Sequence, residues 1–123
     1  MTENIGKIKQ IKSDFPNLKI IKAISVNNSF NKSQVIDFEK VVDHILLDNK
    51  QPGSGQSFDW QLIKDIKFNK DWFLSGGINC DNIKNAVTTT QAPMVDISSG
   101  IEETRGKKST SLINKITTII KTI

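Results

Sequence analysis

Two aspartates lie at the ends of short apolar runs, where parallel β-strands present side chains to substrates. Asp48 follows Ile45, Leu46 and Leu47, and Asp96 follows Val95. A carboxyl group at such a strand end is suited to moving a proton or binding a substrate hydroxyl or amine. The same residue type also starts loops and caps helices. Asp48 is therefore either a site residue or a loop-starter, and Asp96 either a substrate ligand or a polar residue bonded to a neighbouring strand.

Two glycine- or serine-rich turns follow the later apolar runs. Gly76 and Gly77 form the first, and Ser98, Ser99 and Gly100 form the second. Glycine lets the backbone approach a ligand closely, and the start of a following helix offers free N–H groups to a phosphate. Phosphate sites in (βα)8 enzymes frequently use the loops after strands seven and eight. The two turns together predict a phosphate site, with ordinary tight turns as the alternative.

The single histidine and single cysteine of the sequence limit the remaining chemistry. His44 is about 13 Å from Asp48 along an extended strand, so we expect a packed histidine rather than an acid–base partner. Cys80 has no histidine beside it that would activate it as a nucleophile, so a structural role is expected. We predict no metal site, because these two residues form no ligand cluster. A lone cysteine also excludes an internal disulfide and suits a reducing cytoplasm.

Four apolar, β-branched runs must position these residues. Their central residues Ile24, Leu46, Leu74 and Ile97 are 22, 28 and 23 positions apart, with room for one helix in each gap. That period is typical of the βα repeat of a parallel sheet. The strands are predicted at residues 18–26, 44–48, 72–75 and 94–98.

Amphipathic helices are expected before the first strand and after each of the four. Their apolar positions recur at three- and four-residue steps, the pattern of a helix with one buried face. Asp59 and Ser109 are plausible N-caps of the third and last helices, and Asn79 or Asp81 of the fourth. Residues 50–57 and 102–108 are predicted to be loops inside one domain that spans residues 1–123. The apolar positions are Ile5, Ile8, Ile11 and Phe15; Val35, Phe38, Val41 and Val42; Leu62, Ile63 and Ile66; Ile83, Ala86 and Val87; and Leu112, Ile113, Ile116, Ile119, Ile120 and Ile123.

The composition excludes several classes of protein. The 123 residues are 37% hydrophobic and 24% charged, and no stretch approaches the roughly 18 apolar residues of a membrane span. Residues 1–4 do not have the pattern of a secretory leader. The net charge of +4 comes from basic residues spread along the chain, without the aromatic interleaving of a single-strand nucleic-acid site. We expect a cytoplasmic protein that binds neither nucleic acid nor membranes, and a basic balance also suits an anionic small substrate.

Taken in order, these motifs resemble the second half of the phosphoribosylanthranilate isomerase family of tryptophan biosynthesis. Residues 20–26 resemble its fifth strand and residues 45–48 its sixth. Residues 53–60, which include Phe58, Asp59 and Trp60, resemble the following loop and helix start. Residues 74–79 and 95–102 resemble the seventh and eighth strands with their phosphate loops. The resemblance implies an α/β fold that is half of a (βα)8 TIM barrel, strands five to eight with their helices.

The resemblance also implies roles for the site residues in an Amadori rearrangement of N-(5′-phosphoribosyl)anthranilate. Asp48 would be the general acid that protonates the furanose ring oxygen, and Asp96 would contact the substrate near the reacting carbons. No cofactor or metal is implied. The substrate phosphate would be held by Gly76, Gly77, Ser98, Ser99 and Gly100.

Departures from the family pattern are as informative as the matches. The family's general base is a cysteine on its first strand, which this sequence lacks, and Cys80 follows the seventh strand and cannot replace it. Pro52 replaces a loop glycine, and Asn49 follows Asp48 where Thr or Ser is common. We expect the chain alone to be inactive, with its first half supplied by a separate chain or lost. The alternative is a non-catalytic, phosphate-binding half-barrel that pairs with a second copy of itself or with a separate N-terminal half. A related sugar-phosphate isomerase of histidine biosynthesis is disfavoured because it lacks the Phe-Asp-Trp signature.

Overall fold

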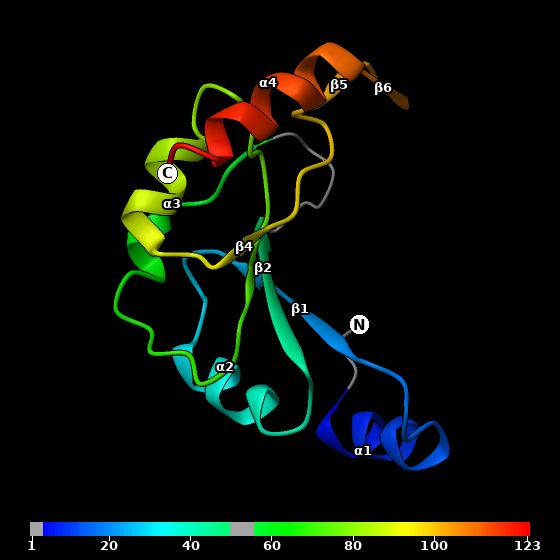
Figure 1. Ribbon diagram of the computed structural model, residues 1–123. Coiled ribbons are helices and arrows are strands. Elements are labelled where there is room, and N and C mark those ends of the chain that lie inside the picture. The colour runs from blue at the N-terminus through cyan, green and yellow to red at the C-terminus, as the bar shows by residue number, and fades with distance from the viewer. Residues whose placement is uncertain (1–3, 50–55) are drawn as a thin grey trace.

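The computed structural model describes residues 4–49 and 56–123, which form an α/β fold around a parallel sheet (Figure 1). Strands β1 (Ile21–Val26), β2 (His44–Asn49), β3 (Phe73–Leu74) and β4 (Met94–Val95) pair in the order β1-β2-β3-β4. All three pairings are parallel, so the carboxyl ends of the strands meet at one edge. The predicted parallel sheet is confirmed, although every strand but β2 is shorter than the sequence indicated.

The helices match most of the predicted amphipathic segments. They are α1 (Ile5–Asp14), α2 (Lys32–Glu39), α3 (Ile83–Thr90) and α4 (Thr110–Ile120), and Asn4 and Asn31 cap the first two. Ser109 caps α4 as predicted, because its side chain accepts the Leu112 N–H. Helix α3 begins differently: Asn79 accepts the N–H groups of Asp81 and Asn82 and so shapes the turn before the helix. Asn82 itself occupies the N-cap position.

Two segments differ from the sequence prediction. The third helix is only a 3-10 turn, η1 (Trp60–Leu62), although Asp59 caps it by accepting the Gln61 N–H. The backbone continues through i→i+3 turns; for example, the Ile66 N–H donates to the Ile63 carbonyl. Residues 102–108, predicted to be a loop, form an antiparallel hairpin of β5 (Glu102–Thr104) and β6 (Lys107–Lys108). The predicted loop at 50–57 lies largely outside the described residues.

The two faces of the sheet have different environments. The face covered by helices carries the core, and Leu47 and Leu74 are fully buried there. On the other face Ala23 and Ser25 of β1 are exposed and Leu46 of β2 is half-buried. Ala23 pairs in register with Leu46, and Leu46 with Phe73, so these residues share that face. The described residues therefore cover one face of the sheet and leave the other largely open.

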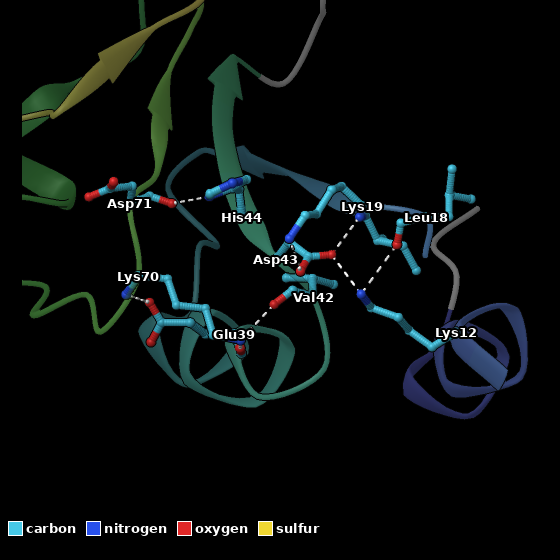
Figure 2. A network of polar contacts seen from close by, with 10 residues as sticks. Lys12, Leu18, Lys19, Glu39, Val42, Asp43, His44, Lys70 and Asp71 are labelled. Carbon is cyan, nitrogen blue, oxygen red and sulfur yellow. Dashed lines mark hydrogen bonds and ion pairs between the residues drawn. The ribbon is translucent and has the colours of Figure 1, made fainter. Parts of the chain in front are cut away.

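A polar network fixes the amino-terminal ends of the strands, opposite the candidate site. Glu39, which is buried, accepts the backbone N–H groups of Asn69 and Lys70, and Lys70 Nζ donates to the carbonyl of Val42 at 2.7 Å. Figure 2 shows this group beside His44, whose Nδ1 lies 2.8 Å from the Asp71 carbonyl oxygen. His44 is half-buried and packed, as the sequence predicted. The network ties α2 and the segment before β3 to the same end of the sheet.

Asp43 lies between Val42 and His44 in the chain, at the same end of the sheet, and has its own set of polar partners (Figure 2). It accepts hydrogen bonds from Lys12 Nζ at 2.7 Å and from the Ile20 backbone N–H at 2.8 Å. These bonds lower the pKa of the Asp43 carboxyl from 3.8 to about 2, against the opposing effect of desolvation. Because the pKa of Asp43 is lower in the folded than in the unfolded state, the ionised carboxylate stabilises the folded state at pH values above about 4. That stabilisation is lost as the pH falls from about 4 to about 2.

We therefore expect Asp43→Asn to lower the free energy of unfolding at pH 7 by about 1–2 kcal/mol. The lowering of the Asp43 pKa by about two units corresponds to less than about 3 kcal/mol, and partial exposure of the ion pair to solvent reduces this value. Urea unfolding between pH 7 and pH 2 checks this. The unsubstituted chain should lose stability between pH 4 and 2 more steeply than the variant. Glu103→Gln, at an exposed ion pair, serves as the control. Equal slopes for the chain and Asp43→Asn would contradict the assignment.

No helix within the described residues combines the length and apolar content needed to cross a membrane.

Candidate functional site

Asp48 lies near the carboxyl end of β2, on the open face of the sheet. It is half-buried, and its Oδ1 accepts the backbone N–H of Asn49 at 2.7 Å. In the described part of the chain its Oδ2 makes no hydrogen bond. One carboxylate oxygen is therefore held by the backbone, and the other is available to a bound molecule.

Gly76 brings the turn after β3 directly against Asp48. Its φ is +90°, and a Cβ added there would lie 2.9 Å from Asp48 Oδ1 and 3.0 Å from the Asn49 nitrogen. Side chains rarely adopt this conformation, and the space is taken as well. A glycine is thus required for the turn to reach the aspartate.

Gly77 joins the same turn to the segment after β2. Its φ is +66°, and a Cβ there would overlap the backbone nitrogen of Ser57. Asn82 holds the turn from the other side: its Nδ2 donates to the Gly77 carbonyl at 2.8 Å, and its Oδ1 accepts the Asn79 N–H at 2.8 Å. The turn is consequently fixed by backbone packing on one side and by a side-chain clamp on the other.

The second predicted turn lies beside the first. Asn79 and Gly100 form an isolated parallel bridge, and a Cβ at Gly100 would overlap the Ile78 carbonyl oxygen. Across residues 4–49 and 56–123, four backbone N–H groups of the two turns donate no hydrogen bond; these belong to Gly76, Gly77, Ser98 and Ser99. Unpaired N–H groups at the carboxyl end of a parallel sheet are the donors that an anion needs.

Asp96 lies at the same edge and is tied to the first turn. It is exposed, its backbone N–H donates to the Leu74 carbonyl at 2.9 Å, and its Oδ2 accepts the Ser75 hydroxyl at 3.2 Å. Ser75 is buried and directly precedes Gly76. The hydroxyl of Ser75 therefore fixes the direction of the Asp96 carboxylate next to the glycine turn.

All the predicted site residues thus lie at one edge of the sheet, and the other candidates do not. Cys80 is half-buried with its Sγ 3.9 Å from the Leu112 carbonyl of α4. His44 is engaged at the opposite end of β2. The described residues hold no group of three potential metal ligands. The edge brings together two carboxyl groups and unpaired backbone N–H groups, a combination that suits acid–base chemistry on a phosphorylated molecule.

Sequence reasoning missed three residues that shape this edge. Ser75 had a usable signal, since alternation along the strand places it on the face of Asp48. Asn82 is three residues after Asn79, a spacing that allows its side chain to reach back to the turn. Lys108 Nζ donates to the Ser98 carbonyl at 3.0 Å, and that contact depends on a hairpin that the sequence did not reveal.

Comparison with known proteins gives consistent matches. The family model described as N-(5′-phosphoribosyl)anthranilate (PRA) isomerase matches residues 5–119. An N-(5′-phosphoribosyl)anthranilate isomerase of Zymomonas mobilis is 40% identical over 111 residues, which are 86% of this chain and 53% of that protein. The chain therefore spans about half the length of the curated relatives it matches.

Solved structures agree with the sequence matches. The phosphoribosylanthranilate isomerase of Thermotoga maritima superposes with a TM-score of 0.81 at 32% identity, over 98% of this chain and 58% of that one. A phosphoribosylanthranilate isomerase in complex with reduced 1-(o-carboxyphenylamino)-1-deoxyribulose 5-phosphate superposes with a TM-score of 0.76 at 30% identity. This second match covers 98% of this chain and 56% of that structure.

Proposed function

We propose a function from the premise that this chain belongs to the N-(5′-phosphoribosyl)anthranilate isomerase family, whose model spans residues 5–119. The chain carries the general acid and the phosphate site of an aldose–ketose isomerisation in tryptophan biosynthesis, in the cytoplasm. The substrate is N-(5′-phosphoribosyl)anthranilate, and the product is the corresponding carboxyphenylamino-deoxyribulose phosphate. The observation that carries the proposal is the contact between the Asp48 carboxyl and the Gly76 turn at an edge with unpaired N–H groups.

Asp48 is the proposed general acid. Its proton would pass to the furanose ring oxygen as the bond between that oxygen and C1′ breaks, while the nitrogen lone pair forms the C1′=N bond of a Schiff base. A general base then removes the C2′ proton, and the resulting enol collapses to the aminoketose. Proton transfer from a positioned carboxyl group contributes typically about 10²–10⁴-fold to a rate. The unpaired Oδ2 of Asp48 is the oxygen suited to this transfer.

The two turns are the proposed phosphate site. Gly76 and Gly77 contribute N–H groups from one turn, and Ser98, Ser99 and Gly100 contribute N–H groups and hydroxyls from the other. Asp96, directed by Ser75, would contact the substrate near its reacting carbons. In support, a solved relative carries a 5-phosphate ligand. No cofactor is required for this chemistry.

The architecture we propose is strands five to eight of a (βα)8 barrel, forming one partial domain over residues 1–123. Three features support it: the open face, the unpaired outer edges of β1 and β4 within the described residues, and coverage of about half of each relative. An apolar groove of about 180 Å³ also opens between α3 and α4 beside β4, and Ile120 and Ile123 in it are 40% and 49% exposed. The remaining strands and the general base would come from residues outside this sequence, on the same or a separate polypeptide.

Turnover measurements test the proposal that this chain supplies the general acid and the phosphate site, and that the general base lies outside this sequence. We expect the 123-residue chain alone to isomerise the substrate at least about 10²-fold more slowly than an assembled enzyme, in which the chain is joined to the first four barrel strands of the Thermotoga maritima relative. The missing base is the physical reason. A kcat for the chain alone that equals that of the assembled enzyme would contradict the proposal.

Sedimentation separates this reading from its alternative, a self-associating half-barrel without catalytic activity. Exposed apolar residues such as Ile21, 49% exposed, would be covered in a dimer of two copies. A stable dimer together with an inactive joined enzyme would favour that alternative.

A further inference from the structure

We propose that Lys108, paired with Glu102, is a positioning residue for the turn formed by Ser98, Ser99 and Gly100. We further propose that Lys108 neutralises the Glu102 carboxylate and so keeps the phosphate site attractive to an anion. This inference rests on the proposed phosphate site, and it assigns roles to two residues that lie next to that site.

The contacts of Lys108 converge on the turn. Its Nζ donates to the Ser98 carbonyl at 3.0 Å and to the Glu102 carboxylate at 3.2 Å, and the Ser98 hydroxyl oxygen lies at 3.5 Å. An ammonium group has three N–H donors, which matches these three acceptors. The Ser98 carbonyl also accepts the Ile101 N–H at 3.3 Å. Lys108 thus ties the Ser98 carbonyl and hydroxyl to the hairpin through one ammonium group.

The β5–β6 hairpin is what brings the two charges together. Glu102 pairs in register with Lys108 across the hairpin, and Gly106, with φ +83°, forms its turn. The Gly106 N–H donates to Glu102 Oε2 at 3.3 Å, and the Ser109 N–H donates to the Ile101 carbonyl at 2.7 Å. The hairpin therefore links the second turn of the site to the start of α4.

The burial of the Glu102 carboxylate makes its ion pair with Lys108 important. The Glu102 side chain is 16% exposed, and within the described part of the chain Lys108 is its only ion-pair partner. A largely buried carboxylate without a counter-charge is unfavourable, and beside a phosphate it also repels the ligand. Loss of Lys108 should therefore weaken anion binding in two ways, through a displaced turn and through an uncompensated negative charge.

The same hairpin provides a matched control. Lys107 pairs with Glu103 at 2.9 Å, but these side chains are 73% and 49% exposed, and among the described residues Lys107 forms no hydrogen bond or ion pair with the turn. Both lysines carry the same charge on the same short strand. A general effect of net charge or hairpin stability would appear in variants of either lysine, whereas a positioning role belongs to Lys108 alone.

Titration of the full 123-residue chain with inorganic phosphate, followed by the amide NMR signals of Gly76, Gly77 and Ser99, tests the inference. We expect Lys108→Met to raise the Kd about tenfold, as for a lost hydrogen bond between charged groups, and Lys107→Met to change it less than about twofold. The Lys108→Met, Glu102→Gln double variant should recover part of the loss, because it removes the uncompensated charge. Lys108→Arg should bind nearly as well as the unsubstituted chain.

Equal Kd values for the two methionine variants would overturn the inference, and so would a double variant that binds no better than Lys108→Met. Urea unfolding of each variant shows that the compared proteins are folded, since a purely structural role lowers stability without changing the Kd of the folded chain. If the unsubstituted chain shows no response to phosphate, the proposed phosphate site fails and this inference fails with it. A normal response in the unsubstituted chain with no effect of Lys108→Met overturns the inference alone.

Discussion

Replacing Asp48 with asparagine is expected to lower the kcat of the assembled enzyme by about 10²–10⁴-fold, the usual contribution of a general acid. An asparagine side chain has nearly the shape of aspartate, and its carbonyl oxygen can still accept the Asn49 N–H. The amide cannot release a proton to the ring oxygen. Ring opening would then depend on water, while the phosphate contacts stay intact.

The division between kcat and KM makes this prediction specific. Because the proposed phosphate contacts of Gly76 and the second turn do not depend on the proton transfer, KM should change less than about threefold. Asp37→Asn, the same substitution at an exposed position on α2, is the control and should leave both constants unchanged. Steady-state kinetics on the assembled enzyme provides the measurement. A kcat that falls less than fivefold in Asp48→Asn would show that another group is the acid.

The sheet could be predicted from the sequence because each strand lies within an apolar, β-branched run and the runs recur at the spacing of a βα repeat. Ile45 and Leu47 on β2 and Leu74 on β3 are all buried, as the runs indicated. The strand ends could not be predicted as well, since pairing depends on neighbours that no local pattern specifies. The hydrogen bonding between β2 and the segment that contains β3 also extends past the end of β3, where the Ser75 N–H donates to the Leu47 carbonyl at 2.8 Å.

The hairpin and the short third helix show where local patterns fail. The residues of β5 and β6 are mostly charged, so no alternation of apolar and polar residues predicted these strands. Cross-strand pairs such as Glu102 and Lys108 stabilise the hairpin instead. Conversely, Leu62, Ile63 and Ile66 have helical spacing, but Ile63 is buried within turns rather than in a helix. The spacing of apolar residues therefore predicts which residues are buried, but it predicts the secondary structure of the segment less directly.

The positions of the site residues could be predicted from a rule of sheet topology. The side chains that hold these residues in place could not be predicted in that way. The carboxyl ends of parallel strands lie at one edge of a sheet, so the sequence alone places Asp48, Asp96 and the glycine turns together. The roles of Ser75 and Asn82 depend on side-chain hydrogen bonds between segments, such as the 3.2 Å bond from Ser75 to Asp96. Such bonds form only at one register and geometry, which residue types alone do not determine.

A methyl group at Gly100 is expected to destabilise the whole chain more than any single change discussed so far. The added Cβ would overlap the Ile78 carbonyl oxygen and approach the Asn79 Cα at 2.9 Å, and both obstacles are backbone atoms. Backbone cannot swing aside as a flexible side chain does, so the bridge between Asn79 and Gly100 must open. We expect Gly100→Ala to lower the free energy of unfolding by about 3 kcal/mol or more, the range of severe overpacking.

Gly106→Ala separates this steric effect from the general cost of replacing a glycine. Gly106 has φ +83°, yet nothing lies within 4 Å of its added Cβ, so only backbone strain of about 1–2 kcal/mol is expected. Urea midpoints of the two variants at equal m-value give the comparison. Because Gly100 bridges the two turns of the candidate site, Gly100→Ala should also weaken the response of the Gly76 and Ser99 amides to phosphate. Equal losses of stability in both variants would mean that the two turns are not packed against each other at Gly100.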